Sequence, residues 1–480
     1  MERWYVLLKR SLATALAVLS LCGIFVGQTL QKLVHQPPDG AGIGFLLTDG
    51  TVLFQGNAES DWWKLTPDNT GSYVNGSWTQ VGSLQSGYVP DAFASAVLAD
   101  GRVVIVGGEY NSGNFDLTNQ GAVYNPSTAA WTPLAPPSFW PWIGDSPAVV
   151  LPNGKFLVGN KLVTQGAELD PKTLTWKKVG YTGKADFNAE EGWTLMPDGT
   201  ILTYDVKDAP NSEIYTPSTQ TWTSAGSTIV DLHSPNSGCL NYGGTHCYHP
   251  PGEVGPGILR PDGTVFATGS LATGARAGHT AIYSPVTRGW TQGPDFPNGD
   301  NAGDSFAALL PSGNVLVLGD SGQLYEFDGT NLTKTLFAPG SLMMLPTGQV
   351  IIGGFPTEVY NPTGTYNPAW APTIKTVPST VMHGMTYQIS GTQFNGLSQA
   401  AAFGDEFETA TNYPLVRITN TSTGHVFYAK THDHSTMGVA TGSKIVSTNF
   451  DVPSTIETGA STLVVVANGI PSTPVNITVQ

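Results

Sequence analysis

A short motif recurs seven times along this chain and constrains its fold more than any other feature. Each copy is Thr, Ala or Pro, then one variable residue, then glycine, followed at once by an apolar run. The turn glycines are Gly50, Gly101, Gly154, Gly199, Gly263, Gly313 and Gly348. A glycine turn followed by four or five β-branched or aromatic residues predicts a hairpin that enters a strand apolar on both faces. Such strands suit a position between neighbouring sheets.

A second motif follows in several of these units. An aromatic-x-Pro turn leads to a tryptophan strand from Tyr124 to Trp131, from Tyr215 to Trp222 and from Tyr283 to Trp290, and Leu169 to Trp176 is a variant. Together the motifs predict four-stranded units with a period of about 50 residues, which resembles the kelch family. The sequence therefore predicts an all-β protein whose residues 38–371 form a seven-bladed kelch β-propeller.

The charge of the chain limits the kinds of ligand that it could bind. Only 12% of the 480 residues are charged and the net charge is -15. Nucleic-acid binding needs a basic footprint, which this chain lacks, so a nucleic-acid partner is excluded. A cation or a neutral polyhydroxyl compound fits the charge better.

The N-terminal segment, residues 1–30, is interpreted as a signal peptide or a membrane anchor. Arg3, Lys9 and Arg10 precede an apolar stretch from Leu12 to Val26, which is the layout of a secretory signal. The alternative is a buried helix. The first interpretation predicts an exported protein, which is secreted, periplasmic or held at the cell surface, with the segment as a tether if it is retained.

Beyond that segment the sequence holds two cysteines, Cys239 and Cys247, in the longest insertion between turn glycines. In an oxidising compartment, such a pair is expected to form a local disulfide. Because His233, His246 and His249 lie nearby, a Cys/His metal site is the alternative.

Residues 372–480 lack the repeat. They contain short segments in which apolar and polar residues alternate, as in strands, and this pattern predicts an immunoglobulin-like sandwich. The segments at Ala402–Glu406, Tyr413–Arg417 and Lys430–Met437 resemble the C-terminal domain of the galactose oxidase and glyoxal oxidase family. That family joins a seven-bladed kelch propeller to such a domain, so the resemblance covers nearly the whole chain after residue 30.

The resemblance also implies a copper site, which can be tested residue by residue. In that family a Thr-His pair on the C-terminal domain reaches the propeller axis and supplies one copper ligand. The histidine of this pair corresponds to His432 here, and His434 stands two residues further along the chain. The family's other ligands, and a tyrosine cross-linked to cysteine, lie about nine residues before the turn glycines. No Cys, Tyr or His stands at those positions here. We therefore expect no Tyr–Cys radical cofactor.

Carboxylates occupy this part of the repeat instead. Eight to ten residues before a turn glycine stand Asp91, Asp145, Glu190, Glu191, Glu253 and Asp304. In equivalent blades these acids would converge at one channel mouth, where like charges demand protons or a cation. We interpret His432, His434, Asp145, Glu190 and Asp304 as candidate ligands of a divalent metal such as calcium, manganese or copper. The alternative is that the acids accept structural hydrogen bonds and that the histidines lie at a solvated hairpin tip.

Aromatic residues near the same mouth suggest a ligand. Sugars stack on indole faces while carboxylates bind their hydroxyls, so Trp140 and Trp142 are candidate binding residues, or else pack internally. Asp91, Glu191, Glu253 and His249 complete the predicted ligand-binding set.

Two functional hypotheses follow. The first is an extracytoplasmic propeller that binds carbohydrate or a cell-surface partner through its acidic mouth, with or without a divalent metal. The second is a metal-dependent oxidoreductase of the galactose oxidase-like type that acts on alcohols, aldehydes or sugars. A purely structural surface protein is a third interpretation.

Overall fold

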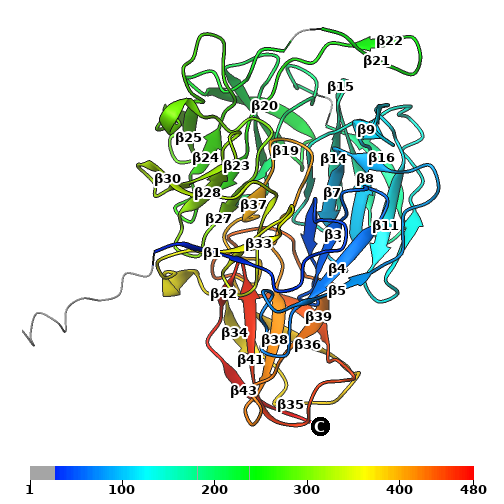
Figure 1. Cartoon of the computed structure of the whole chain (residues 1–480), viewed down its shortest axis with the longest axis vertical. Coiled ribbons are helices and arrows are strands. Elements are labelled where there is room, and N and C mark those ends of the chain that lie inside the picture. Colours follow the sequence, from blue (N-terminus) through cyan, green and yellow to red (C-terminus); the bar gives the residue numbers. More distant parts are fainter. Residues whose placement is uncertain (1–26, 181, 237) are drawn as a thin grey trace, which may run out of the picture.

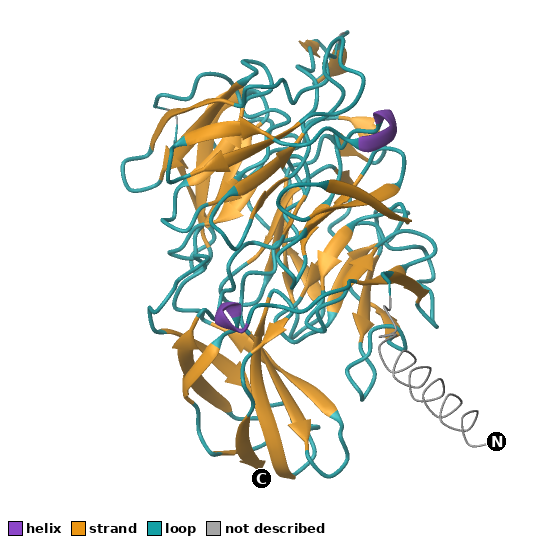
Figure 2. Cartoon of the chain, turned by 90° about the vertical axis from the view of Figure 1, so that its left-hand side faces the viewer, coloured by secondary structure: helices purple, strands orange, loops and turns teal. Residues whose placement is uncertain are grey.

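The computed structural model describes residues 27–180, 182–236 and 238–480, and in these residues the chain is all-β with a propeller-like arrangement of sheets (Figure 1). Most of the predicted N-terminal signal or anchor falls outside the described residues. Among the residues that are described, no helix is long and apolar enough to span a bilayer. The two helical turns are of the 3₁₀ type, η1 (Pro297–Gly299) and η2 (Pro368–Trp370) (Figure 2).

Seven antiparallel sheets in the described residues follow the sequence repeat, each with four strands from the repeat units. The first three sheets contain β2 (Gly44–Leu46), β3 (Val52–Gln55), β4 (Trp62–Thr66) and β5 (Ser77–Gln80); β7 (Ala94–Val97), β8 (Val103–Val106), β11 (Gly121–Asn125) and β12 (Ala130–Pro133); and β13 (Ala148–Val150), β14 (Phe156–Asn160), β15 (Val163–Asp170) and β16 (Thr175–Val179).

The next two sheets contain β17 (Thr194–Leu195), β18 (Ile201–Tyr204), β19 (Asn211–Thr216) and β20 (Thr221–Ser227); and β23 (Gly257–Leu259), β24 (Val265–Thr268), β25 (Thr280–Ser284) and β26 (Gly289–Gln292). The last two contain β27 (Ala307–Leu309), β28 (Val315–Leu318), β29 (Gln323–Phe327) and β30 (Leu332–Phe337); and β31 (Leu342–Met344), β32 (Val350–Ile352), β33 (Glu358–Asn361) and β1 (Thr29–Lys32).

These sheets form a closed ring. Most inner strands contact the inner strand of the next sheet, and β31 of the last sheet contacts β2 of the first. Between the third and fourth sheets, the Asn188 amide donates to the carbonyl of Val163 at 2.8 Å. Strand β1 precedes residue 38, where the sequence predicted the propeller to begin, and it supplies the outer strand of the last sheet.

The predicted hairpins are present at all seven turn glycines. Each glycine has a φ between 76° and 90°, a left-handed conformation in which a residue with a side chain is strained. Its N–H bonds to the carbonyl three residues earlier, as from Gly50 to Leu47 and from Gly348 to Leu345. The predicted strand follows each turn. The glycine therefore recurs because each inner hairpin needs a left-handed backbone conformation at this position.

The tryptophan strands lie at the outer edge of their sheets. In three sheets, the tryptophan ring packs on the tyrosine of the neighbouring strand with a centroid separation of 5.1 to 5.2 Å: Tyr124–Trp131, Tyr215–Trp222 and Tyr283–Trp290. This recurring contact explains why the two residues keep a constant spacing in the sequence.

Residues 372–480 form a separate set of strands below the ring in Figure 1, with its own apolar core around Val416, Phe450 and Val465. Its strands are β34 (Thr373–Thr376), β35 (Thr380–Val381), β36 (Thr386–Thr392), β38 (Leu415–Asn420), β39 (Val426–His432), β40 (Val446–Asp451), β41 (Gly459–Ala467), β42 (Ile470–Pro471) and β43 (Val475–Val479).

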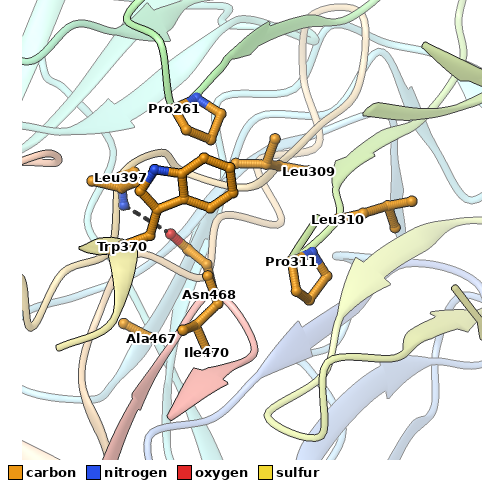
Figure 3. A pocket seen from close by; sticks show the side chains of 10 residues that line it. Pro261, Leu309, Leu310, Pro311, Trp370, Leu397, Ala467, Asn468 and Ile470 are labelled. Carbon is orange, nitrogen blue, oxygen red and sulfur yellow. Dashed lines mark hydrogen bonds between the residues drawn. The ribbon is translucent and has the colours of Figure 1, made fainter. Parts of the chain in front are cut away.

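This C-terminal unit docks against the face of the ring that carries the turn glycines. A Cβ atom on Gly50 would lie 2.4 Å from the Tyr428 ring, and one on Gly469 would lie 2.8 Å from the Cα atom of Gly348. At the joint around Trp370, the Leu397 N–H donates to Asn468 Oδ1 at 3.1 Å (Figure 3). The close fit fixes the C-terminal unit relative to the ring.

One strand leaves the C-terminal unit and enters the ring. Strand β37 (Ala401–Ala402) pairs antiparallel with the inner strand β27 through Ala307↔Ala402. We call residues 403–412, which follow it, the axial loop. Strand β27 runs toward the docking face, and the antiparallel β37 runs away from it. The axial loop therefore lies at the opposite mouth of the ring. Asp405 and Glu406 at its tip are buried.

Candidate functional site

A buried lysine that the sequence analysis did not select lies at the centre of the acidic mouth. The Lys161 side chain has no exposed surface, and its Nζ lies 3.1 Å from Glu109 Oε1 and 2.5 Å from Asp145 Oδ1. It also donates to Glu190 Oε1. The Tyr248 ring lies 5.0 Å from Nζ and supplies a cation–π contact. The lysine thus already provides a cation to three of the carboxylates.

Burial dominates the electrostatics of these groups. Burial, helped by the negative charge of Glu190, raises the pKa of Asp145 to about 8 even though Lys161 opposes the shift. Burial likewise raises the pKa of Glu190 to about 8 and that of Glu109 to about 7. Burial would lower the pKa of Lys161, but Asp145 and Glu190 outweigh it and hold that pKa well above its usual value. At neutral pH the lysine is therefore charged and the acids are partly protonated.

Four further acids belong to the same cluster, because their charges act on the three acids that contact Lys161 or on one another. Burial raises the pKa of Asp304 to about 6 and, with Glu190 and Asp304 nearby, that of Glu253 to about 12. Burial, with the charge of Glu406 beside it, raises the pKa of Asp405 well above its usual range. Burial, with the charges of Asp145 and Asp304, does the same to the pKa of Glu406, although a hydrogen bond with Asp405 opposes the shift. We call the seven acids and Lys161 the axial cluster. Its members are Glu109, Asp145, Lys161, Glu190, Glu253, Asp304, Asp405 and Glu406.

The backbone is unusual at two of these acids. Glu190 and Asp304 both have positive φ values, 60° and 46°, which residues with side chains rarely adopt. Both stand nine residues before their turn glycines, at Gly199 and Gly313. Such conformations cluster at functional sites because surrounding contacts must hold them in place.

A hairpin from the longest insertion covers this mouth. It consists of β21 (Leu240–Tyr242) and β22 (His246–Tyr248), and a disulfide joins Cys239 to Cys247. The Tyr248 hydroxyl donates to Glu190 Oε1 at 3.1 Å. The Trp142 ring meets the Tyr242 ring edge-on at a centroid distance of 5.2 Å. We call residues 239–248 the mouth hairpin.

A cavity of about 370 Å³ lies beside the mouth hairpin. Its walls include the aromatic rings of Phe187, Tyr242 and Tyr248 and the basic groups of Lys207 and His249. Because Tyr248 contacts both this cavity and Glu190, the cavity adjoins the axial cluster. Aromatic walls with a few polar groups are typical of small-molecule sites.

A second buried lysine gathers acids outside the axis. Lys184 Nζ lies 2.8 Å from Asp186, 3.0 Å from Glu191 and 2.7 Å from Glu213, and its side chain is fully buried. Asp205 lies 3.8 Å away. Glu191 therefore belongs to this group, not to the mouth where the sequence analysis placed it. The chain turns at Glu190, whose φ is 60°, and the two adjacent carboxylates reach different lysines, Glu190 to Lys161 and Glu191 to Lys184.

Neither His432 nor His434 lies beside the carboxylates of the axial cluster. The expectation that these histidines share one metal site with Asp145, Glu190 and Asp304 is therefore corrected. Both ring nitrogens of His432 face carboxylates of the C-terminal unit, Asp433 at 2.8 Å and Asp451 at 3.1 Å. His434 Nδ1 bonds to Thr448, and burial lowers the pKa of this histidine to about 3. The physical reason is that the backbone of His434 bonds to Ala99, in a turn at the docking face, at the far end of the inner strands.

Other predicted residues are distributed between packing and binding positions. Trp140 is buried and donates to Gln165 at 3.3 Å, as expected for a packing residue. Asp91 lies on β6 (Pro90–Asp91), which forms a small separate sheet with β9 (Tyr110–Asn111) and β10 (Asn114–Phe115). Trp142 supports the mouth hairpin and His249 lines the cavity.

Sequence reasoning missed Lys161 because it counted only backward from each turn glycine. In a hairpin the second strand returns to the same mouth, so residues six to eight positions after the glycine also lie there. That count gives Glu109 after Gly101 and Lys161 after Gly154. Asp405 and Glu406 stand in a segment that resembled the family's C-terminal domain, but the reach into the axis was assigned to His432.

Comparisons with known proteins show general likeness of shape only. No protein-family model and no curated protein sequence matches the chain. A solved fungal alcohol oxidase of the AA5 family, in complex with copper, is 16% identical with a TM-score of 0.49, over 94% of this chain and 98% of that one.

Two other solved structures are similar to the same degree. A streptogramin B lyase is 12% identical with a TM-score of 0.47, over 70% of this chain and 98% of its own. The extracellular domain of a putative hybrid two-component system from B. thetaiotaomicron is 11% identical with a TM-score of 0.49, over 95% of this chain and 59% of its own. All these scores lie below 0.5, so the likeness carries no conclusion about function.

Proposed function

We propose that this protein is an exported seven-bladed kelch propeller, joined to an immunoglobulin-like domain, that binds a carbohydrate at its acidic mouth. The observation that carries the proposal is the cavity beside the mouth hairpin, where three aromatic rings face a space that adjoins the axial cluster. A monosaccharide or disaccharide unit fits a volume of about 370 Å³, which lies within the ordinary range of ligand sites.

The chemistry of the walls supports a polyhydroxyl ligand. The apolar face of a sugar ring stacks on aromatic side chains such as Tyr242 and Phe187. Lys207 and His249 supply polar groups for hydroxyl or carboxylate groups of the ligand. The disulfide in the mouth hairpin is typical of an oxidising compartment, which supports export of the protein.

Binding can be tested with immobilised glycans and isothermal titration calorimetry. Tyr242→Ala removes one aromatic wall and should weaken glycan affinity at least tenfold. Tyr366→Ala is the matched control, since Tyr366 lines a different cavity near Pro362 and Pro471. No glycan binding by the wild type, or equal binding by both variants, would refute the proposal. Specific binding of a cell-surface protein at the mouth instead would identify the other kind of partner.

A metal-dependent oxidoreductase is the second candidate, and a group of acids favours it. Oxygen atoms of Glu109, Asp145 and Glu190 lie within 4.8 Å of one another, as metal ligands do. However, Lys161 already contacts all three. The residues of the axial cluster do not fit a radical copper centre, because both described cysteines are in the disulfide and the cluster contributes no histidine. Hydrogen peroxide release with alcohols, aldehydes or sugars under oxygen would support an oxidase, and its absence would count against one.

A further inference from the structure

The tip of the axial loop places two consecutive acids where the ring offers them no basic partner. Pairing of β37 with β27 fixes the direction of the loop. Within the described chain, the ion pairs of Lys161 go to Glu109, Asp145 and Glu190. No Lys or Arg side chain in the same residues pairs with Asp405 or Glu406. The positive charge of Lys161 therefore does not compensate the charge of the loop tip.

The hydrogen bonding of Asp405 is a separate observation that points to a cationic ligand. The residue is only 2% exposed. Neither of its carboxylate oxygens receives a hydrogen bond from an N–H or hydroxyl group of the described residues. The polar group that it meets is the Glu406 carboxyl, which can bond to it only when a proton is shared. A buried carboxylate without donors is costly unless a cation takes their place.

The distances fit a single ion. Oxygen atoms from Asp145, Asp405 and Glu406 all lie within 4.8 Å of one another. Calcium binds oxygen at roughly 2.3–2.6 Å, so two ligands on opposite sides of the ion lie up to about 5 Å apart. Magnesium prefers shorter bonds of about 2.0–2.1 Å and strict octahedral geometry. The donor set of oxygens alone favours a hard cation, and calcium tolerates the irregular geometry that three protein carboxylates impose better than magnesium does.

We propose that Asp145, Asp405 and Glu406 bind one calcium ion at the axis of the ring. Asp145 lies between the two cations, with Lys161 on one side and the calcium on the other. The ion joins the third sheet to a loop of the C-terminal unit, so it locks the two parts of the chain together. The proposal goes beyond carbohydrate binding and does not depend on the cavity, which has other walls.

The experiment uses the full chain after removal of metals with a chelator. Equilibrium dialysis against calcium, followed by elemental mass spectrometry, should find one calcium per chain, and calcium should raise the thermal midpoint. Asp405→Asn and Glu406→Gln keep the volume and remove the charge, so each should weaken calcium affinity at least tenfold and reduce the thermal shift. His432→Ala is the control and should retain both effects.

The outcomes are distinct. The absence of stoichiometric calcium in the wild type, even at millimolar concentration, would overturn the proposal without the need for any variant to fold. Calcium retained with unchanged affinity in Asp405→Asn and Glu406→Gln would also overturn it. Loss in His432→Ala but not in the loop variants would move the site to the C-terminal unit and refute this assignment. Glycan titration of the same samples reports separately on the proposed function.

Discussion

Replacement of Lys161 by methionine should destabilise the protein strongly at alkaline pH and much less at acidic pH. Methionine keeps a long apolar stem but removes the ammonium that contacts Glu109, Asp145 and Glu190. Loss of one partner from a buried ion pair costs about 3–5 kcal/mol, because the remaining charges stay buried without compensation. With unfolding entropy of roughly 2.1 cal/mol/K per residue, a ring of about 330 residues has about 0.7 kcal/mol/K, so the midpoint falls by about 4–7 °C.

The pH dependence identifies the cause. Burial already raises the pKa values of Asp145 and Glu190 to about 8 with the lysine present, and they rise further without it. A carboxyl whose pKa is higher in the folded than in the unfolded protein stabilises the fold below its unfolded value of about 4, and that contribution is lost as pH rises through the folded value. The deficit of Lys161→Met should therefore be largest near pH 8 and smaller near pH 5.

The assay is differential scanning calorimetry at both pH values. Lys155→Met is the matched control, since the Lys155 side chain is 36% exposed and pairs with one carboxylate of the described residues, that of the buried Glu168, at 3.0 Å. Solvent screens the exposed ammonium of this pair, so its loss should cost less than the loss of the fully buried Lys161 ammonium. Equal destabilisation by the two variants, or a deficit for Lys161→Met that does not change between pH 5 and pH 8, would refute the account of Lys161 as the counter-ion of the axial cluster.

Three further outcomes are expected. Cys239→Ser/Cys247→Ser should weaken glycan binding, because the mouth hairpin carries Tyr242 and Tyr248, while the calorimetric midpoint of the ring changes little; an affinity equal to wild type would separate the hairpin from the site. The metal-free wild type should lose stability between pH 5 and pH 8, since burial raises the pKa values of Asp145 and Glu190 to about 8, and a stability that increases over that range in urea titrations would contradict those shifts. Lys184→Met should destabilise the fold by about 3–5 kcal/mol without a change in calcium affinity, and a tenfold weaker affinity would show that the two lysine groups are not independent.

The sequence was informative where a local rule repeats. Each turn glycine needs a positive φ, and each Tyr–Trp pair needs neighbouring strands, so both features leave a periodic trace in the sequence. The convergence of Asp145 and Glu190 could be predicted from the same register. Lys161 and Glu191 could not be placed by that count, because their contacts depend on the return strand and on the direction of individual side chains.

The axial loop shows a different limit. Which segment of the C-terminal unit enters the ring depends on the pairing between Ala307 and Ala402, which are far apart in the sequence. Resemblance to a family directed attention to His432, whose ring instead bonds within its own unit. A short polar motif does not indicate which distant segment it will contact. In the sequence alone, Asp405 and Glu406 are therefore recognisable only as two adjacent acids.

The pairing of β1 with β33 has a consequence for how the chain is made (Figure 1). Thr29 pairs with Asn361, so the last sheet joins the two ends of the ring. During synthesis, β1 has no partner until more than three hundred further residues have been made, and the ring stays open until then. Closure of so long a loop is entropically costly and slow relative to local hairpins. An unpaired strand edge is also a template for pairing with other chains. The newly made protein therefore has the greatest need of protection against aggregation just before its final sheet is complete.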